Sequence, residues 1–423
     1  MIDLLISPCR QLLTLAGGPG PRRGAALREL GLVEQGALGI DCERGKVAYA
    51  GPESGLPQDE LSVDCEVLSA ADCVVMPGFV DSHTHLVFAG SRAGEFYRRA
   101  QGESYQSIAA SGGGIAMTMH ATREAAPQEL AGAAWKRLQQ LYNNGTTTVE
   151  IKSGYGLSRE AELASIKAIR ELGGQAPGLV YSTFLGAHLV PPEYQDRREE
   201  YVALVCEMLP QVAQAGLADF YDIFVDALAF TREEAARIVA AGRATRLKLR
   251  LHADEFGDDG TAAWGVGQGA LSLDHLGGIG PEGIAALAGA DTIATLLPAT
   301  MFFSGHGRYA PAREMIEAGC AVALATDLNP GSSLVYSMPF TMTLAALAMK
   351  MTAEECIAAA TINGAHALGA AERIGSLEPG KRADVIVLDV PHYEEIAYHV
   401  GRDIVRDVFI AGQEIKRDGC MAL

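Results

Sequence analysis

The chain of 423 residues has no C-x-x-C pair among its eight cysteines, which lie far apart along the sequence. A zinc ribbon needs such pairs, and a disulfide framework is typical of short secreted chains, so this scatter argues against both. We therefore expect reduced, mostly packed thiols and a cytoplasmic location.

Long apolar runs and basic clusters are also missing. No stretch reaches the roughly 18–20 apolar residues of a membrane-spanning helix, and the N-terminus lacks the basic start and apolar segment of a signal peptide. With 34 Lys+Arg against 52 Asp+Glu, the formal charge is −18. Nucleic acid is bound through clustered Lys and Arg. We therefore expect no membrane and no nucleic-acid partner, and an anionic substrate must be held by a few local cations.

Apolar runs rich in β-branched residues alternate with helical segments through the middle of the chain. Eight such runs are present, at 80–87, 146–152, 180–188, 220–225, 247–252, 270–275, 292–297 and 321–327. Capping-box spacings that begin at Thr231 and Thr352 mark two of the helices. This alternation predicts an α/β fold with a TIM-like (β/α)8 barrel. A doubly wound sheet is the alternative, but no Gly-rich dinucleotide turn follows the first run.

Short β segments occur near both ends of the chain, at 46–50, 383–389 and 407–412, separated by Gly and Pro turn signals. The two ends resemble each other and differ from the middle. We expect residues 1–76 and 375–423 to form a small β-sandwich domain, and residues 77–374 to form the barrel.

Histidines gather where the predicted barrel strands end. His83 and His85 are two residues apart in the first strand, so both side chains face the barrel mouth, where barrel enzymes hold their active sites. His252 and Asp327, at the ends of the fifth and eighth strands, complete a His3Asp set. Such a set can bind zinc-like metals and leaves one coordination position for water. Asp327 is also consistent with a helix N-cap. No lysine ends the fourth strand to form a carbamylated bridge between two metal ions, so we expect one ion.

Glu255 and His275 are the candidates for proton transfer. Glu255 follows His252 by three residues, within reach of a water molecule or a substrate nitrogen at the metal. Asp254 is the weaker alternative to it. His275 ends the sixth strand, where it stabilises developing charge or serves as a buried structural histidine. Either residue can take the first proton.

Three further residues bear on the substrate. Arg92, in the connection after the first strand, can hold a carboxylate with two hydrogen bonds. Tyr155 lies in a Gly-flanked turn at the barrel mouth and can donate a hydrogen bond. His188 ends the third strand and either binds substrate or hydrogen-bonds the backbone. Together these residues predict a small anionic substrate.

The chain resembles the amidohydrolase superfamily over nearly its whole length. The segment PGFVDSHTH at 77–85 opens the resemblance and GSLEPGKRAD at 375–384 closes it. Five segments are similar to the members that open the ring of 4-imidazolone-5-propanoate in histidine degradation: HLVFAGSR at 85–92, EIKSGYGL at 150–157, FLGAH at 184–188, HADE at 252–255 and ATDLNPGS at 325–332.

This resemblance implies a metal-dependent hydrolase that converts the imidazolone to N-formimidoyl-L-glutamate. It implies one zinc or iron ion per subunit, with the ligands His83, His85, His252 and Asp327. It also implies catalysis by Glu255 and His275, and contacts with substrate or product from Arg92, Tyr155, His188, Glu255, Asn329, Gly331 and Ser332. By analogy with the family we expect a homodimer. His306 and Arg308 depart from the pattern and receive no role.

Two other interpretations stay open at this point. A cytosine- or guanine-type deaminase also carries His-x-x-Glu after the fifth strand, but a neutral base needs neither Arg92 nor Tyr155. A non-catalytic protein of the same shape typically lacks metal ligands, whereas the full set is present here.

Overall fold

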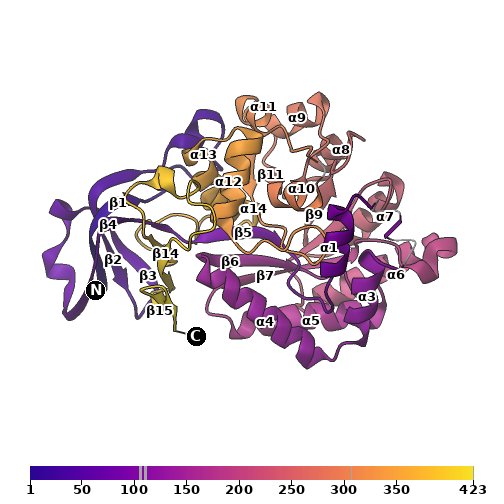
Figure 1. Cartoon of the computed structure of the whole chain (residues 1–423), viewed down its shortest axis with the longest axis horizontal. Coiled ribbons are helices and arrows are strands. Elements are labelled where there is room, and N and C mark those ends of the chain that lie inside the picture. Colours follow the sequence, from indigo (N-terminus) through magenta and orange to yellow (C-terminus); the bar gives the residue numbers. More distant parts are fainter. Residues whose placement is uncertain (104–106, 109–111, 306, 423) are drawn as a thin grey trace.

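The computed structural model describes residues 1–103, 107–108, 112–305 and 307–422, and it contains two eight-stranded sheets (Figure 1). One sheet consists of parallel strands that pair with their neighbours in sequence order. Its strands are β5 (Phe79–Thr84), β6 (Thr146–Lys152), β7 (Leu179–Ala187), β8 (Phe220–Phe224), β9 (Lys248–Ala253), β10 (Ser272–His275), β11 (Ile293–Leu296) and β12 (Ala321–Leu324). The eight predicted strands and the predicted barrel architecture are confirmed.

The first and last barrel strands meet just beyond the end of β12. Thr84 and Leu328 form a parallel bridge. The amide of His85 donates to the carbonyl of Leu328 at 2.8 Å, and the amide of Asp327 donates to the carbonyl of His83 at 3.0 Å. The barrel is therefore nearly closed, and its closure runs through residues predicted to bind metal.

Helices follow the barrel strands and cover the outside of the sheet (Figure 1). They are α1 (Ala93–Ala100), α3 (Ile115–Glu124), α4 (Pro127–Asn143), α5 (Arg159–Gln175), α6 (Arg198–Gln214), α7 (Arg232–Arg243), α8 (Thr261–Gln268), α9 (Pro281–Ala288), α10 (Pro298–Ser304), α11 (Ala312–Glu317), α12 (Met338–Met349), α13 (Ala353–Ala360) and α14 (Ile362–Ala367). Short 3-10 turns are η1 (Gly24–Arg28), η2 (Glu53–Gly55), η3 (Gln58–Glu60), η4 (Pro192–Arg197) and η5 (Tyr393–Glu395). Both predicted capping boxes are present, at Thr231 before α7 and Thr352 before α13. None of the described helices is long and apolar enough to span a membrane.

The second sheet joins the two ends of the chain. Its strands are β1 (Ile2–Leu13), β2 (Leu32–Asp41), β3 (Lys46–Pro52), β4 (Leu61–Pro77), β13 (Val385–Leu388), β14 (Val405–Ile410), β15 (Gln413–Arg417) and β16 (Cys420–Met421). The long strand β4 pairs in parallel with β1 and antiparallel with β13, so N-terminal and C-terminal strands meet on it. The sequence predicts a small β-sandwich built from both ends, and the structure confirms that both ends contribute to one eight-stranded sheet. The domain boundaries at 76 and 374 stay a prediction.

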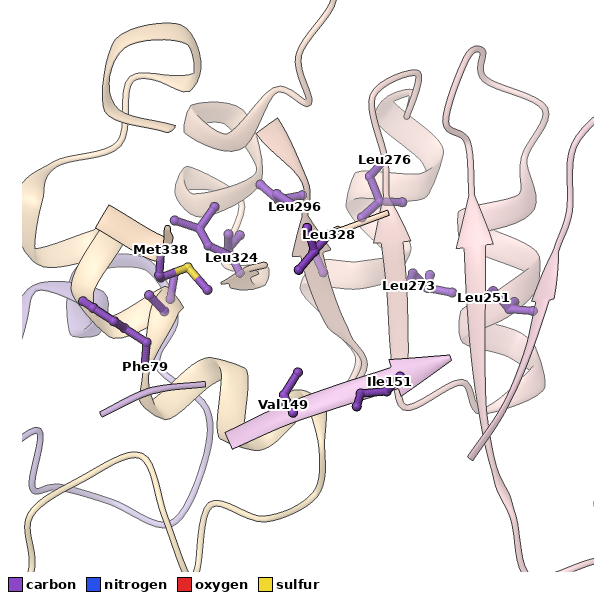
Figure 2. Close-up of a cluster of buried hydrophobic side chains, with 14 of the residues drawn as sticks. Phe79, Val149, Ile151, Leu251, Leu273, Leu276, Leu296, Leu324, Leu328 and Met338 are labelled. Carbon is purple, nitrogen blue, oxygen red and sulfur yellow. The ribbon is translucent and has the colours of Figure 1, made fainter. Parts of the chain in front are cut away.

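The alternation of side chains along the barrel strands explains how one sheet holds both an apolar core and a polar site. Ile151, Leu251 and Leu273 belong to the buried apolar cluster drawn in Figure 2. Their chain neighbours point to the opposite face of the sheet, because successive side chains of a strand alternate. The neighbours of Leu251 and Leu273 include His252 and Asp274, which are also buried. On these two strands the leucines therefore face the helices, and His252 and Asp274 face the interior of the barrel.

Candidate active site

A cavity of about 500 Å³ lies at the carboxyl ends of the barrel strands and gathers the predicted site residues. Its lining includes His85, Arg92, Tyr155, His188, His252, Glu255, His275, Asp327, Asn329, Gly331 and Ser332. Two residues singled out from the sequence are missing from this lining: the predicted ligand His83 and the alternative proton-transfer residue Asp254, both of which are buried. The structure thus brings together side chains that come from both ends of the barrel sequence.

The four predicted metal ligands lie close to one another. Asp327 Oδ1 is 3.5 Å from His83 Nε2 and 3.5 Å from His85 Nε2, and the rings of His83 and His252 are 4.7 Å apart between centroids. Ligand atoms of His83, His85 and Asp327 all fall within 4.8 Å of one another, as do those of His83, His252 and His275. His275, which the sequence placed in catalysis, is therefore also near enough to bind a metal ion.

Two buried carboxylates fix the orientation of two of these imidazoles. His83 Nδ1 lies 2.7 Å from Asp274 Oδ2, and His252 Nδ1 lies 3.1 Å from Asp222 Oδ1. A carboxylate at Nδ1 places the proton there and leaves the lone pair on Nε2. Both rings are therefore held as metal-ligating histidines are commonly held.

The residues present fit a divalent cation. His83 Nε2 is buried and has no hydrogen-bond partner among the described residues, and an unpaired buried polar atom is costly unless it has another partner. Burial lowers the pKa of His83 and His85 well below the usual value, so that both rings are neutral and free to donate a lone pair. Neutral imidazoles beside one carboxylate are the donor set that metals such as zinc and iron accept.

Asp327 is held by its backbone and by a hydroxyl. Its φ of 50° lies in the left-handed region, which aspartate tolerates better than most residues. Thr300 Oγ1, on α10, donates to Asp327 Oδ2 at 2.6 Å, which leaves Oδ1 to face the two histidines. Burial raises the pKa of Asp327 to about 6. The residue does not act as the helix N-cap that the sequence left as an alternative; it lies in the cluster of predicted ligands.

Glu255 lies next to His275 in the lining of the cavity. The Oε1 atom of Glu255 is 3.6 Å from His275 Nδ1. Burial, with the nearby charges of Asp327 and Asp226, raises the pKa of Glu255 well above its usual value. A carboxyl with a raised pKa binds its proton more tightly than an exposed glutamate does, and a buried carboxyl beside the predicted metal ligands is placed to transfer a proton. Asp254 instead accepts hydrogen bonds from the amides of Thr261 and Ala262 at the start of α8.

Arg92 lies at the cavity wall with one side already paired. Its Nε and Nη2 atoms lie 2.9 and 2.8 Å from Glu95 Oε2. Its other terminal nitrogen, Nη1, packs over Gly331, where a Cβ atom would come within 2.1 Å of it. Gly331 therefore leaves the space that the guanidinium occupies, and the Glu95 carboxylate fixes the plane of that guanidinium beside the cavity.

Tyr155 and His188 form an aromatic wall next to His85. The rings of His85 and His188 are stacked, with centroids 5.4 Å apart, and the ring of Tyr155 lies 5.7 Å from that of His85. His188 Nδ1 lies 2.9 Å from the carbonyl oxygen of Gly154. His188 thus makes the backbone contact that the sequence left open and still lines the cavity.

Asn329 organises the loop after β12. Its Oδ1 accepts hydrogen bonds from the amides of Gly331 and Ser332, both at 2.8 Å, and its Nδ2 donates to the carbonyl of Asp327 at 2.8 Å. The loop that follows Asp327 is therefore folded around one amide side chain. Product contacts by Asn329, Gly331 and Ser332 stay a prediction.

The sequence alone missed several residues that shape this site. Asp222, Asp274 and Thr300 contact predicted ligands, and Arg99 donates to the carbonyl of Gly331 at 2.9 Å. A signal was present for Asp222 and Asp274, since charged residues inside apolar strands are rare without a partner. Thr300 and Arg99 gave no such signal. His306 lies outside the described residues.

A substitution at Gly331 tests how tightly Arg92 is seated. Gly331→Ala is expected to raise KM about 10-fold or more, because the new methyl group must displace the guanidinium from its place beside Glu95. Steady-state kinetics of Gly331→Ala, Arg92→Ala and the double variant measure this. The double variant should be no worse than Arg92→Ala. Additive losses would show that Gly331 acts independently of Arg92.

Comparisons with known proteins place the chain in a family. The profile of the amidohydrolase family matches residues 74–415. The chain is 47% identical over 418 residues to the imidazolonepropionase of Solibacter usitatus, covering 99% of both proteins. It is also 47% identical over 421 residues to that of Symbiobacterium thermophilum, covering 99% of this chain and 98% of the relative.

The fold is shared more widely than the sequence. The structure of E. coli guanine deaminase superposes with a TM-score of 0.71 at 17% identity, covering 98% of this chain and 99% of that one. At this identity the likeness shows the fold and leaves the activity to the site residues. The family match and the near-full-length relatives together lead to one assignment: the chain belongs to the amidohydrolase family and, within it, to the imidazolonepropionases.

Proposed function

We propose that the protein hydrolyses 4-imidazolone-5-propanoate to N-formimidoyl-L-glutamate. The observation that carries the proposal is the arrangement of one cavity, in which a guanidinium stands beside a buried His/Asp cluster and a carboxyl of raised pKa. The relatives with 47% identity over nearly the full length bear the name of this activity. Such a site suits a small, cyclic, anionic substrate.

The reaction adds water across one carbon–nitrogen bond of the ring. The ring carbonyl carbon gains an oxygen, its bond to the ring nitrogen breaks, and the nitrogen gains a proton. A divalent metal, zinc or iron, would be held by His83, His85, His252 and Asp327. It would act as a Lewis acid and would lower the pKa of water, so that a nucleophile is available at neutral pH. The remaining tasks fall to the other side chains of the cavity.

These side chains bind the substrate or transfer protons in the proposed mechanism. Arg92 binds the propanoate carboxylate through the nitrogen that Glu95 leaves available, and Tyr155 and His188 pack along the ring. Glu255 accepts a proton from the attacking water and delivers it to the departing nitrogen. His275 lies 3.6 Å from Glu255 and orients its carboxyl. It also stabilises the negative charge that develops on the carbonyl oxygen.

An assay with freshly generated imidazolonepropanoate tests the proposal. Purified protein should consume the compound and release formimidoylglutamate, and a chelator should stop the reaction until metal is restored. Cytosine and guanine serve as controls, because a deaminase of the same fold would act on a neutral base. Deamination of either base, without turnover of the imidazolone, would replace this proposal with the deaminase alternative.

Arg92→Ala is expected to raise KM about 10- to 100-fold, the loss that follows when a charge-assisted hydrogen bond of about 1.5–3 kcal/mol is removed. Arg92→Lys is the matched variant, because it keeps the positive charge but cannot pair with Glu95 through two nitrogens and still offer a third to the substrate. Its KM should fall between those of the wild type and Arg92→Ala. Unchanged KM and kcat in Arg92→Ala would exclude the carboxylate contact.

A further inference from the structure

A network of buried charges lies directly beneath the predicted metal ligands. It consists of Glu150 and Lys152 on β6, Asp222 on β8, Arg250 on β9 and Asp274 on β10. All five are almost completely shielded from solvent, the most exposed being Asp222 at 2%. Buried charges at this density need mutual pairing. Asp222 and Asp274 orient two of the imidazoles, but the mechanism proposed above gives Glu150, Lys152 and Arg250 no task.

Lys152 stands at the centre of this network. Its Nζ atom is 2.8 Å from Asp222 Oδ2, 2.9 Å from Glu150 Oε1 and 3.7 Å from Asp274 Oδ2. Burial alone would favour the neutral amine, but Asp222 and Glu150 raise the pKa of Lys152 above its usual value. The ammonium is therefore charged and bound to carboxylates from three strands.

The two aspartates next to Lys152 are those that hold the imidazoles. Asp222 uses Oδ2 for Lys152 and Oδ1 for His252, while Asp274 uses Oδ2 for His83. Arg250 contacts Asp274 at 2.9 Å, so that aspartate has a second cation. Among the ion pairs of the described residues, Lys152 is the only lysine or arginine that pairs with Asp222.

We propose that Lys152 is a positioning residue for metal binding, which holds Asp222 and Asp274 so that His252 and His83 present Nε2 to one ion. This inference rests on the proposed metal site and deepens it. Without the ammonium, the carboxylates of Asp222 and Asp274 would repel each other and turn away from the imidazole rings. The orientation of His252 would be lost more than that of His83, because Arg250 still pairs with Asp274. Groups that orient metal-ligating histidines typically contribute 10- to 100-fold to metal affinity or activity.

The test measures metal affinity in the absence of substrate. Metal-free wild type, Lys152→Met and Lys416→Met are titrated with Zn²⁺ in competition with a chromophoric chelator. Lys416 is the matched control, because it is another fully buried lysine, paired with Asp403 at 2.8 Å and remote from the site. We expect Lys152→Met to bind Zn²⁺ about 10- to 100-fold more weakly, and Lys416→Met to bind it as the wild type does.

A second measurement separates positioning from loss of stability. In cobalt-loaded protein the visible absorption reports ligand geometry, and it should change in Lys152→Met but not in Lys416→Met at matched folded fraction. Where Lys152→Met does not fold, Asp222→Asn takes its place, since it keeps the volume of the side chain and removes the charge that links Lys152 to His252. It should weaken Zn²⁺ binding within the same range.

The outcomes are distinct. Wild-type affinity and an unchanged cobalt spectrum in folded Lys152→Met, or in Asp222→Asn, would overturn the positioning role and leave the proposed function intact. Equal losses in Lys152→Met and Lys416→Met would assign the effect to general destabilisation and overturn it as well. Failure of the wild type to bind Zn²⁺ would overturn the metal site itself and this inference with it.

Discussion

Asp327→Ala is expected to abolish turnover and to release most of the bound metal. The carboxylate is the one anionic member of the proposed ligand set, and its Oδ1 lies 3.5 Å from both His83 Nε2 and His85 Nε2. With alanine at this position only the neutral imidazoles remain. The ligand set then lacks its negative charge and its fourth donor, which hold a divalent ion. Metal content measured after gel filtration, together with the rate of imidazolone consumption, gives the result.

Thr300→Val is the graded control for this variant. It removes the hydroxyl that donates to Asp327 Oδ2 but leaves the carboxylate in place. Metal affinity should fall by about 10-fold, as for other groups that orient a ligand, and activity should return at high metal concentration. Full metal content and full activity in Asp327→Ala would remove Asp327 from the ligand set.

Glu255→Gln is expected to lower kcat by about 10²- to 10⁴-fold, the usual contribution of a general acid–base. Glutamine keeps the shape of the side chain but neither accepts nor releases the proton. Metal content should stay close to that of the wild type, because Glu255 does not belong to the predicted ligand set. Pre-steady-state and steady-state rates on metal-loaded protein measure the loss.

Asp254→Asn is the matched control, since it changes the adjacent carboxyl. Asp254 caps the start of α8 through the amides of Thr261 and Ala262. Asparagine caps a helix about as well as aspartate and keeps one accepting oxygen, so the loss of stability should stay below about 1 kcal/mol, and kcat should be nearly unchanged. If Asp254→Asn were the variant that lost kcat, the proton shuttle would pass from Glu255 to its neighbour.

The barrel and the convergence of its polar residues were predictable from local patterns. Each apolar run of suitable length became a strand, and His83, His252 and Asp327 converged because parallel strands end at one face of the sheet. This convergence depends only on the order of the strands along the chain. It is independent of how neighbouring strands are offset.

The contacts among side chains were less predictable, because they depend on register and on distant segments. Arg92 pairs with Glu95 and packs over Gly331, which lies far away in sequence. Arg250 lies two residues before His252 and so faces the same side of its strand, which was a usable signal for a buried charge. Its partner Asp274 lies on the next strand, and only the paired sheet identifies it.

The closure of the barrel links the stability of the fold to the proposed metal ion. The first and last strands are joined at the backbone of His83, His85 and Asp327, and the side chains of the same three residues are proposed ligands. An ion bound by all three residues would link the first strand to the segment after the last strand. A ligand that binds only the folded protein adds about 4 kcal/mol to the free energy of unfolding when its concentration is a thousand times Kd. Resistance to heat and to proteolysis then becomes a measure of how fully the protein is loaded, apart from any catalysis.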